Sequence, residues 1–324
     1  MRILTLLLVL LMVGCAPVQM RGVNLLQSSQ VPLDDLQNVE NMQNLKILGA
    51  NTVAFIPFIN QDTETGCNLS IDENYSQARL KKTIELAHQA GLHVVLKPQI
   101  LIPGSWAGMV KSDNESGWAC WFSAYSDNLI PLAQLAQDTH TEMLVIGTEL
   151  HHTETRPEWR KLVDQIRMIY HNKISYVAHD VHDLEFFTAL DKVDSVGITY
   201  YPPLEKEALR TQMKLLVSQL KTDVIKLNKP FWIAEIGITS RTGALENPWL
   251  WPEQLGKDII PDPALQANVL DSWLTEMKGD WHTGILIWAW YSDKNAGGLS
   301  DTDFTIQNKP ATDVVSCHWL GRCH

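Results

Sequence analysis

A short apolar run rich in β-branched residues, then a polar turn, then a segment with helical periodicity, recurs along this chain of 324 residues. Strands that alternate with helices predict a parallel sheet, because parallel strands need a long crossover connection. Eight such units predict that the sheet closes, so we expect an α/β protein with a (β/α)8 TIM-barrel fold. The expected strands are Arg21–Leu25, Thr52–Pro57, His93–Pro98, Met143–Glu149, Ile174–His179, Val193–Tyr200, Phe231–Ile236 and Gly284–Trp290.

Two segments illustrate the helical pattern. A helix over Ala78–Gln89 is expected to end at Ala90-Gly91, where glycine can take the left-handed conformation of a C-cap. A second helix is expected after Pro157, because its apolar residues fall on one helical face. Those residues are Trp159, Leu162, Val163, Ile166, Ile169 and Tyr170. No linker or charge run divides residues 21–324, so we expect one domain and a monomer.

Residues 1–14 have the features of a secretion signal. Arg2 supplies a positive start, and Leu4–Val13 is an apolar core too short to span a bilayer. The run Met12-Val13-Gly14-Cys15 resembles a bacterial lipobox, with Met where Leu is usual. We therefore expect residues 1–14 to be a lipoprotein signal peptide. A plain secretion signal that is cut nearby is the alternative.

Cleavage at the lipobox would make Cys15 the lipidated N-terminus of the mature protein, with residues 15–20 as a short tether. Ala16 follows Cys15, and in lipoproteins a residue other than Asp at this position favours forwarding to the outer membrane. The sequence therefore predicts a lipid-anchored protein of the bacterial cell envelope, at the outer membrane.

The other cysteines are Cys67, Cys120, Cys317 and Cys323, an even number for an oxidising compartment. Four cysteines allow three pairings. We favour Cys317–Cys323, which closes a short loop in the tail, and Cys67–Cys120, which would tie together the long loops after two early strands. Zinc is the rival interpretation, but no CxxC pair is present.

The overall charge narrows the class of substrate. A formal net charge of −11 argues against nucleic acid, whose phosphates would be repelled. It suits a neutral substrate. The chain also carries 12 Trp. Most are expected to fill the core, but Trp near active-site loops would suggest stacking against sugar rings.

Two predicted strands end in a carboxylate. Glu149 closes the apolar run of the fourth strand, and Glu235 lies at the end of the seventh. The carboxyl ends of parallel barrel strands share one mouth, so we expect the two side chains to converge. Glycosidic cleavage needs two such carboxyl groups, and a separation of roughly 5 Å gives retention of configuration. Either Glu as a structural partner of a barrel Arg or Lys is the alternative.

Glutamates that end strands four and seven resemble those of the clan A glycoside hydrolases, which are retaining (β/α)8 enzymes. Several runs, in order along the mature chain, are similar more narrowly to glycoside hydrolase family 113, a group of β-mannanases. These runs are Lys97-Pro98, Gly104-Ser105-Trp106, Gly147-Thr148-Glu149-Leu150, Trp159-Arg160, Asp194-Ser195-Val196-Gly197, Tyr200-Tyr201-Pro202, Glu235-Ile236-Gly237, Trp288-Ala289-Trp290 and Lys309-Pro310-Ala311.

The resemblance implies that Glu149 is the acid/base and Glu235 the nucleophile of an enzyme that hydrolyses a β-linked polysaccharide or oligosaccharide, β-1,4-mannan first. The acid must then keep its proton near neutral pH while the nucleophile stays ionised. Many clan A enzymes have Asn before the acid/base, where it contacts the sugar 2-hydroxyl. Here Thr148 stands there, so that contact is altered.

The resemblance also implies roles for two aromatic residues. A tyrosine at the end of strand six hydrogen-bonds the nucleophile in the clan, and we assign this role to Tyr200 over Tyr201. A tryptophan on the last strand forms the floor of the subsite for the reacting sugar, and we assign this role to Trp288. We expect the side chains of Trp288 and Trp290 to point to the same side of the last strand.

Four further residues are candidates for substrate binding. Lys97 ends the third strand and is too costly to bury unpaired, so it either binds a sugar hydroxyl or pairs with a barrel carboxylate. Trp106 either stacks on a neighbouring sugar or packs in a lid. His179 is expected to line the cleft, and Asn24 to contact sugar.

Other chemistries are poorly supported. His151, His152, His179 and Asp180 suggest a metal, but adjacent histidines do not easily share one ion and no HExxH motif is present. We therefore expect no metal and no cofactor. A GxSxG elbow and a phosphate-binding glycine loop are also missing from the sequence. The second hypothesis is a non-catalytic TIM-barrel surface lipoprotein that binds glycans.

Overall fold

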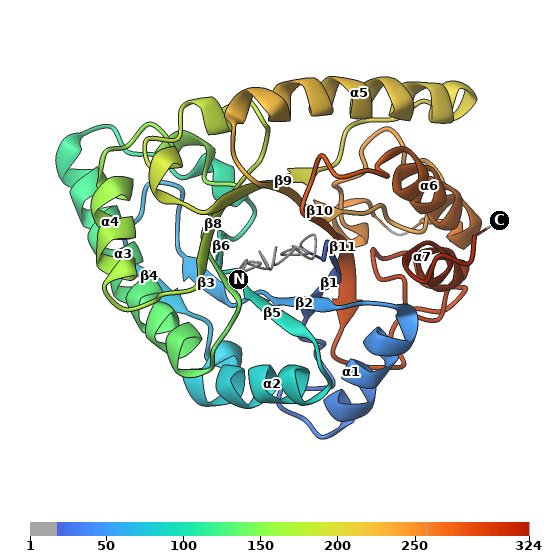
Figure 1. Ribbon diagram of the computed structural model, residues 1–324, viewed down its shortest axis with the longest axis horizontal. Helices are drawn as coiled ribbons and strands as arrows, with labels where there is room; N and C mark the ends of the chain where they lie inside the picture. The colour runs from blue at the N-terminus through green and yellow to red at the C-terminus, as the bar shows by residue number, and fades with distance from the viewer. Residues whose placement is uncertain (1–17, 257, 324) are drawn as a thin grey trace, which may run out of the picture.

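The computed structural model describes residues 18–256 and 258–323. The proposed signal peptide and Cys15 therefore lie outside the described residues. Eight parallel strands form a closed barrel in the order β1-β11-β10-β9-β8-β7-β5-β2, as Figure 1 shows. They are β1 (Met20–Leu26), β2 (Thr52–Phe55), β5 (His93–Leu96), β7 (Met143–Thr148), β8 (Lys173–Ala178), β9 (Ser195–Tyr200), β10 (Phe231–Ile236) and β11 (Gly284–Tyr291). The predicted TIM-barrel fold is confirmed, and each predicted strand overlaps one barrel strand.

Helices surround the barrel (Figure 1). They are α1 (Gln37–Leu48), α2 (Gln77–Gln89), α3 (Glu115–Asp138), α4 (Glu158–Arg167), α5 (Leu209–Leu227), α6 (Pro263–Glu276) and α7 (Pro310–Trp319). The two helices expected around 78–89 and after Pro157 are confirmed as α2 and α4. Gly91 has a φ of 75° after α2, as its predicted left-handed conformation requires. The alternation of strands with α-helices is interrupted once. Between β8 and β9 lie two short 3-10 helices, η4 (Asp183–Glu185) and η5 (Leu190–Lys192).

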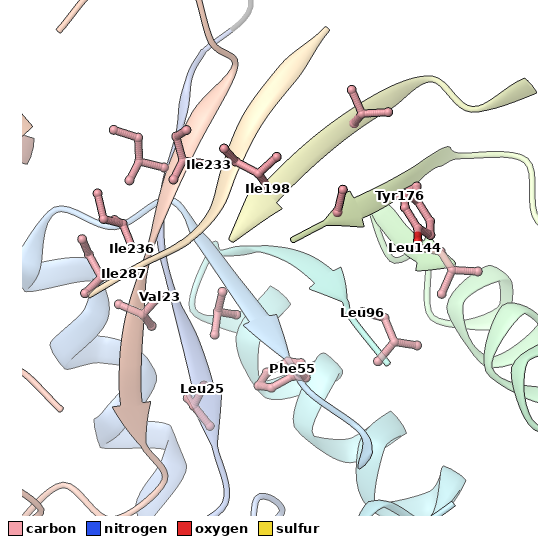
Figure 2. Close-up of a cluster of buried hydrophobic side chains, with 14 of the residues drawn as sticks. Val23, Leu25, Phe55, Leu96, Leu144, Tyr176, Ile198, Ile233, Ile236 and Ile287 are labelled. Carbon is pink, nitrogen blue, oxygen red and sulfur yellow. The ribbon is translucent and has the colours of Figure 1, made fainter. Parts of the chain in front are cut away.

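The core has two layers, as alternation along the strands requires. Outward-facing side chains such as Val23, Leu96 and Ile198 pack between the strands and the helices (Figure 2). Inward-facing side chains such as Val95, Val145 and Leu286 form a second cluster inside the barrel. Both layers are almost fully buried, so the barrel is a rigid support for the residues at its mouth.

A small three-stranded sheet lies beside the barrel and was not predicted. It has the order β4-β3-β6, with β3 (Phe58–Gln61), β4 (Leu69–Ile71) and β6 (Gln99–Leu101). A disulfide joins Cys67, between β3 and β4, to Cys120 in α3, and a second joins Cys317 to Cys323. Both predicted pairings are confirmed, although Cys120 lies in a helix and not in a loop.

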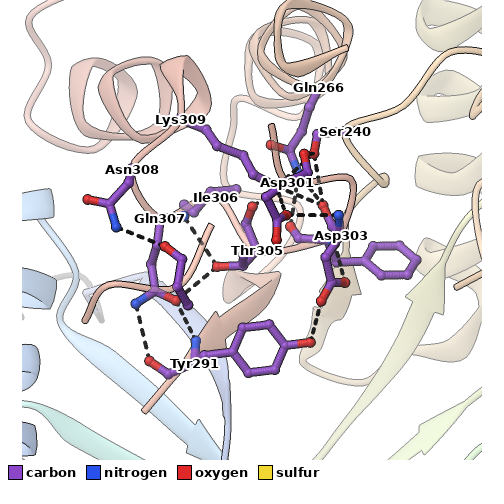
Figure 3. A network of polar contacts seen from close by, with 12 residues as sticks. Ser240, Gln266, Tyr291, Asp301, Asp303, Thr305, Ile306, Gln307, Asn308 and Lys309 are labelled. Carbon is purple, nitrogen blue, oxygen red and sulfur yellow. Dashed lines mark hydrogen bonds and ion pairs between the residues drawn. The ribbon is translucent and has the colours of Figure 1, made fainter. Parts of the chain in front are cut away.

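A buried polar network fixes the segment that follows β11 (Figure 3). The Lys309 ammonium is fully buried and forms an ion pair with Asp301 at 2.6 Å. It also donates to Ser240 Oγ at 2.7 Å. The Tyr291 hydroxyl donates to Asp303 at 2.6 Å. These contacts tie the loop after β11 to the loop after β10, which follows Glu235.

Within the described residues, no helix is both long and apolar enough to cross a bilayer.

Candidate active site

Glu149 and Glu235 both lie at the carboxyl-terminal mouth of the barrel. Glu149 directly follows β7, and Glu235 is the second-last residue of β10. Glu149 has a φ of 56°, a left-handed conformation that is uncommon for a residue with a side chain. Its amide donates to the carbonyl of Val177 at 2.8 Å, which holds this backbone in place. The negative charge of Glu149 acts to raise the pKa of Glu235, as expected when two carboxyl groups lie near one another.

Glu149 accepts hydrogen bonds from two neighbouring strands. The Thr199 hydroxyl, on β9, donates to Glu149 Oε1 at 2.6 Å. His179 Nδ1, just after β8, lies 3.3 Å from the same oxygen. His179 therefore lines the mouth, as predicted. Thr199 was not predicted, although the strand pattern contains a signal for it: Val196 and Ile198 face the outer core, so Thr199 faces inward.

Glu235 is held by a cation and a phenol. The Lys97 ammonium forms an ion pair with Glu235 Oε1, and the Tyr201 hydroxyl donates to Oε2 at 3.1 Å. Lys97 is fully buried and Glu235 is 4% exposed. Of the two roles left open for Lys97, the structure supports pairing with a barrel carboxylate and places the ammonium out of reach of a ligand.

Both glutamates lie where the strand register is irregular. The parallel ladder shifts between Val145 and Thr148 on β7, and between Ile233 and Glu235 on β10. An extra residue in a ladder bends the strand and turns the following side chain to a new direction. On β10, Ala234 already faces into the barrel, so strict alternation would turn Glu235 outward, and the irregularity lets Glu235 face the mouth as well.

The two carboxyl groups have opposite pKa shifts. Burial acts to raise the pKa of Glu149, but the hydrogen bonds from His179 and Thr199 outweigh burial and hold the pKa below its ordinary value. The bond to Glu149 raises the pKa of His179. Burial raises the pKa of Glu235, the Lys97 ammonium opposes this rise, and the charge of Glu149 adds to it. The shifts of Glu149 and His179 have directions that favour the proton of this pair on the imidazole.

This distribution differs from the expectation that Glu149 itself holds the proton. The physical reason is that the His179 side chain is 53% exposed, so water and Glu149 together stabilise its charged form.

The assignment of Tyr200 as the partner of the nucleophile is wrong. Tyr201 contacts Glu235, whereas the Tyr200 ring packs against Trp273 of α6 at a centroid distance of 5.5 Å. Alternation explains the difference, because Tyr200 continues the outward-facing set of Val196 and Ile198.

Trp288 lies inside the barrel mouth, with its ring 5.3 Å from Lys97 Nζ. The Trp251 ring packs edge-to-face on it at 6.1 Å. The expectation that Trp290 has the same facing is wrong. Its indole lies in the outer core and donates to Asn41 of α1 at 2.7 Å. An irregularity in the pairing of β1 with β11 separates the two Trp side chains onto opposite faces.

Two of the polar residues predicted to bind substrate donate hydrogen bonds to backbone carbonyls. Asn24 is fully buried and its amide donates to the carbonyl of Ala234 at 2.9 Å, and its contact with sugar stays a prediction. The Thr148 hydroxyl donates to the carbonyl of Pro98 at 3.1 Å and is 1% exposed. Its only proton is therefore used within the barrel.

Trp106 lies on the rim of the mouth. It is 39% exposed, and its ring lies 4.8 Å from that of His179. Both a lid role and stacking on a sugar are compatible with this position. A separate group beside the mouth, formed by His151, Glu154 and Asp183, has the donor atoms to hold a metal ion.

The sequence profile of Glycoside Hydrolase Family 113 matches residues 28–309, which is most of the chain. The chain belongs to Glycoside Hydrolase Family 113. The resemblance found in the sequence is thereby confirmed, and the protein is a glycoside hydrolase.

Solved structures of the family share the fold. The GH113 β-mannanase AaManA from Alicyclobacillus acidocaldarius, in complex with ManMIm, matches with a TM-score of 0.82 and 23% identity, over 94% of this chain and 98% of that chain. A GH113 β-1,4-mannanase matches with a TM-score of 0.82 and 21% identity, over 94% and 100%. A Glycoside Hydrolase Family 5 mannosidase from Rhizomucor miehei matches with a TM-score of 0.68 and 11% identity, over 94% and 93%. No curated protein matches the sequence.

Replacing Lys97 by Met should lower the free energy of unfolding by about 3–5 kcal/mol at neutral pH, because the Glu235 carboxylate would stay buried without its cation. Loss of the ammonium also raises the pKa of Glu235 further. The folded chain would then bind a proton more readily than the unfolded one, so the loss should shrink as the pH falls from about 8 to about 5. Urea unfolding at both pH values measures this.

Two controls accompany this experiment. Lys97→Met combined with Glu235→Gln should recover most of the loss, because no charge then stays buried. Lys111→Met removes an exposed partner of Glu64 and should change stability little. A Lys97→Met protein as stable as the wild type at both pH values would show that the ion pair does not hold the site.

Replacing Tyr201 by Phe should lower kcat/KM by about 10- to 100-fold, because a hydrogen bond to a charged group contributes about 1.5–3 kcal/mol. Tyr200→Phe is the matched control and should change kcat/KM less than about threefold. Steady-state kinetics on one soluble substrate measures both. Equal losses in the two variants would contradict the assignment of Tyr201.

Proposed function

We propose that this family 113 glycoside hydrolase is a retaining β-glycosidase that cleaves β-1,4-mannan, with Glu149 as acid/base and Glu235 as nucleophile. One observation carries the proposal. Two carboxyl groups at the mouth of one barrel have different partners, a half-exposed imidazole for Glu149 and a buried ammonium for Glu235. Acid and nucleophile need this difference, because one must deliver a proton and the other must stay ionised.

In the first step, Glu235 attacks the anomeric carbon and Glu149 gives a proton to the leaving oxygen, so the glycosidic bond breaks as a glycosyl ester forms. The ammonium of Lys97 favours the ionised form of Glu235, although burial and the charge of Glu149 leave the pKa of Glu235 above its ordinary value. Tyr201 and Lys97 contact different oxygens of Glu235, so the carboxylate is held in one orientation. Such orientation lowers the entropic cost of reaching the transition state.

The proton of the first step starts on His179. A sugar chain in the mouth would remove water from His179, and desolvation disfavours the charged imidazole. The proton then moves from His179 Nδ1 to Glu149 Oε1, and from there to the leaving oxygen. No proton is gained or lost by the site until the leaving group departs with it.

In the second step, Glu149 takes a proton from water, whose oxygen attacks the glycosyl ester and releases Glu235. Esterification removes the negative charge of Glu235, so the pKa of Glu149 falls and Glu149 acts as a base. Two displacements at one carbon restore the original configuration of the sugar.

The aromatic residues at the mouth suit a sugar chain. Trp288 and Trp251 form a packed pair near Glu235, and Trp106 lies on the other side beside His179. Thr148 donates its proton to Pro98, so toward a sugar 2-hydroxyl it could act only as an acceptor. Mannose and glucose differ at that carbon, so this position bears on the choice of sugar.

Mannan is proposed because the similar family structures are described as β-mannanases or β-1,4-mannanases. We also propose that Cys15 anchors the mature protein in the envelope of a bacterium, at the outer membrane. A non-catalytic glycan-binding lipoprotein is disfavoured, because binding alone does not require a buried Lys97–Glu235 ion pair beside a second carboxyl group.

Release of reducing sugar from mannan, glucomannan, xylan and β-glucan tests the substrate. We expect the highest rate on mannan and about a thousandfold or greater loss in Glu235→Ala, because removal of a nucleophile eliminates the covalent route. Binding to one of these polysaccharides without release from any of them would support the glycan-binding alternative.

Replacing Glu149 by Ala should affect substrates according to their leaving group. Aryl glycosides with an activated leaving group need little protonation, so their first step should be nearly unchanged, whereas hydrolysis of mannan should fall at least about a hundredfold. Pre-steady-state and steady-state rates on both substrates measure this. An equal reduction in the rate of the first step on both substrates would exclude Glu149 as the acid.

A further inference from the structure

We propose that His151, Glu154 and Asp183 form a binding site for a divalent zinc ion beside the active site. The ligand atoms of these three side chains lie within 4.8 Å of one another. Ligands of a tetrahedral zinc ion, at about 2.0–2.2 Å from the metal, are about 3.5 Å apart, so only small shifts are needed.

Burial distinguishes this group from an ordinary acidic cluster. Glu154 is 2% exposed and Asp183 is 9% exposed. Asp183 Oδ2 is buried and has no hydrogen-bond partner among the residues that the structure describes, which is costly for a carboxylate oxygen. An ion at this position would satisfy that oxygen.

A second feature of the group is its unbalanced negative charge. The Glu154 carboxylate accepts a hydrogen bond from the Tyr176 hydroxyl at 3.1 Å, and the Asp183 carboxylate contacts His151 Nδ1 at 2.9 Å. Among the described residues, no lysine or arginine forms an ion pair with either carboxylate. The nearby charge of Asp180 adds to the repulsion. A divalent cation would balance the negative charges of Glu154 and Asp183.

The donor set selects the metal. Imidazole together with two carboxylates suits zinc better than calcium or magnesium, which prefer oxygen ligands alone. Three protein ligands leave the fourth position for water, and the His151 side chain is 45% exposed, so an ion can enter from solvent.

The site would connect two functional loops. His151 and Glu154 follow Glu149, and Asp183 follows His179. A bound ion would hold these loops together and so support the spacing of His179 and Glu149. The metal candidates in the sequence were His151, His152, His179 and Asp180, whereas the fold brings His151 to Glu154 and Asp183.

Calorimetric titration of the full chain with zinc chloride, after removal of metal with EDTA, tests the proposal. We expect one zinc ion per chain, with at least tenfold weaker binding in His151→Ala and in Asp183→Asn. His152→Ala is the matched control, because its imidazole is adjacent but outside the group, and it should bind as the wild type does. Zinc should also raise the melting temperature of the wild type and of His152→Ala only.

His151 is largely exposed, so His151→Ala should fold even if Asp183→Asn does not. Absence of zinc binding by the wild type, or equal weakening in His151→Ala and His152→Ala, would overturn the proposal. Neither readout uses enzymatic activity, so the result does not depend on the proposed reaction.

Discussion

The pairing of β1 with β11 closes the barrel, and the position of every residue at the active site follows from that closure. All eight ladders are parallel, so the strand ends that carry Lys97, Glu149, His179, Tyr201 and Glu235 lie at one mouth. Residues far apart in the sequence thereby contact one another. The dense packing on both faces of the sheet keeps these strand ends in place.

Burial of charge is the second constraint. Two carboxyl groups in a largely buried mouth destabilise one another unless each has its own partner. Lys97 lies on a rigid strand and forms a buried ion pair with Glu235. His179 lies on a more exposed loop, and in the proposed reaction it passes its proton to Glu149. The difference between these two partners gives the two glutamates different roles in the proposed reaction.

Much of this arrangement could be predicted from the sequence, because buried parallel strands are short apolar runs and their ends share one mouth. Glu149, Glu235, Lys97 and His179 were found in this way. The facing of Trp290 was not predicted correctly, because the β1–β11 pairing shifts before this residue. Sequence periodicity does not mark such a shift in advance.

The error at Tyr200 had a different origin. Alternation counted from Val196 and Ile198 assigns Tyr200 to the outer face and Tyr201 to the mouth, so the sequence contained the signal. The group of His151, Glu154 and Asp183 could not have been predicted in the same way. It depends on the fold placing His151, in the 3-10 helix η3 (His151–Thr153), close to Asp183 in η4.

The central claim is that Glu235 forms a covalent bond with the sugar. Incubation with a 2-deoxy-2-fluoroglycosyl fluoride of the matching sugar, followed by peptide mass spectrometry, tests it most directly, because the fluorine slows release of the intermediate. The account predicts one added glycosyl group per chain, on Glu235, and no labelling of Glu235→Gln. Turnover of the reagent without any adduct, or an adduct on Glu149, would contradict it.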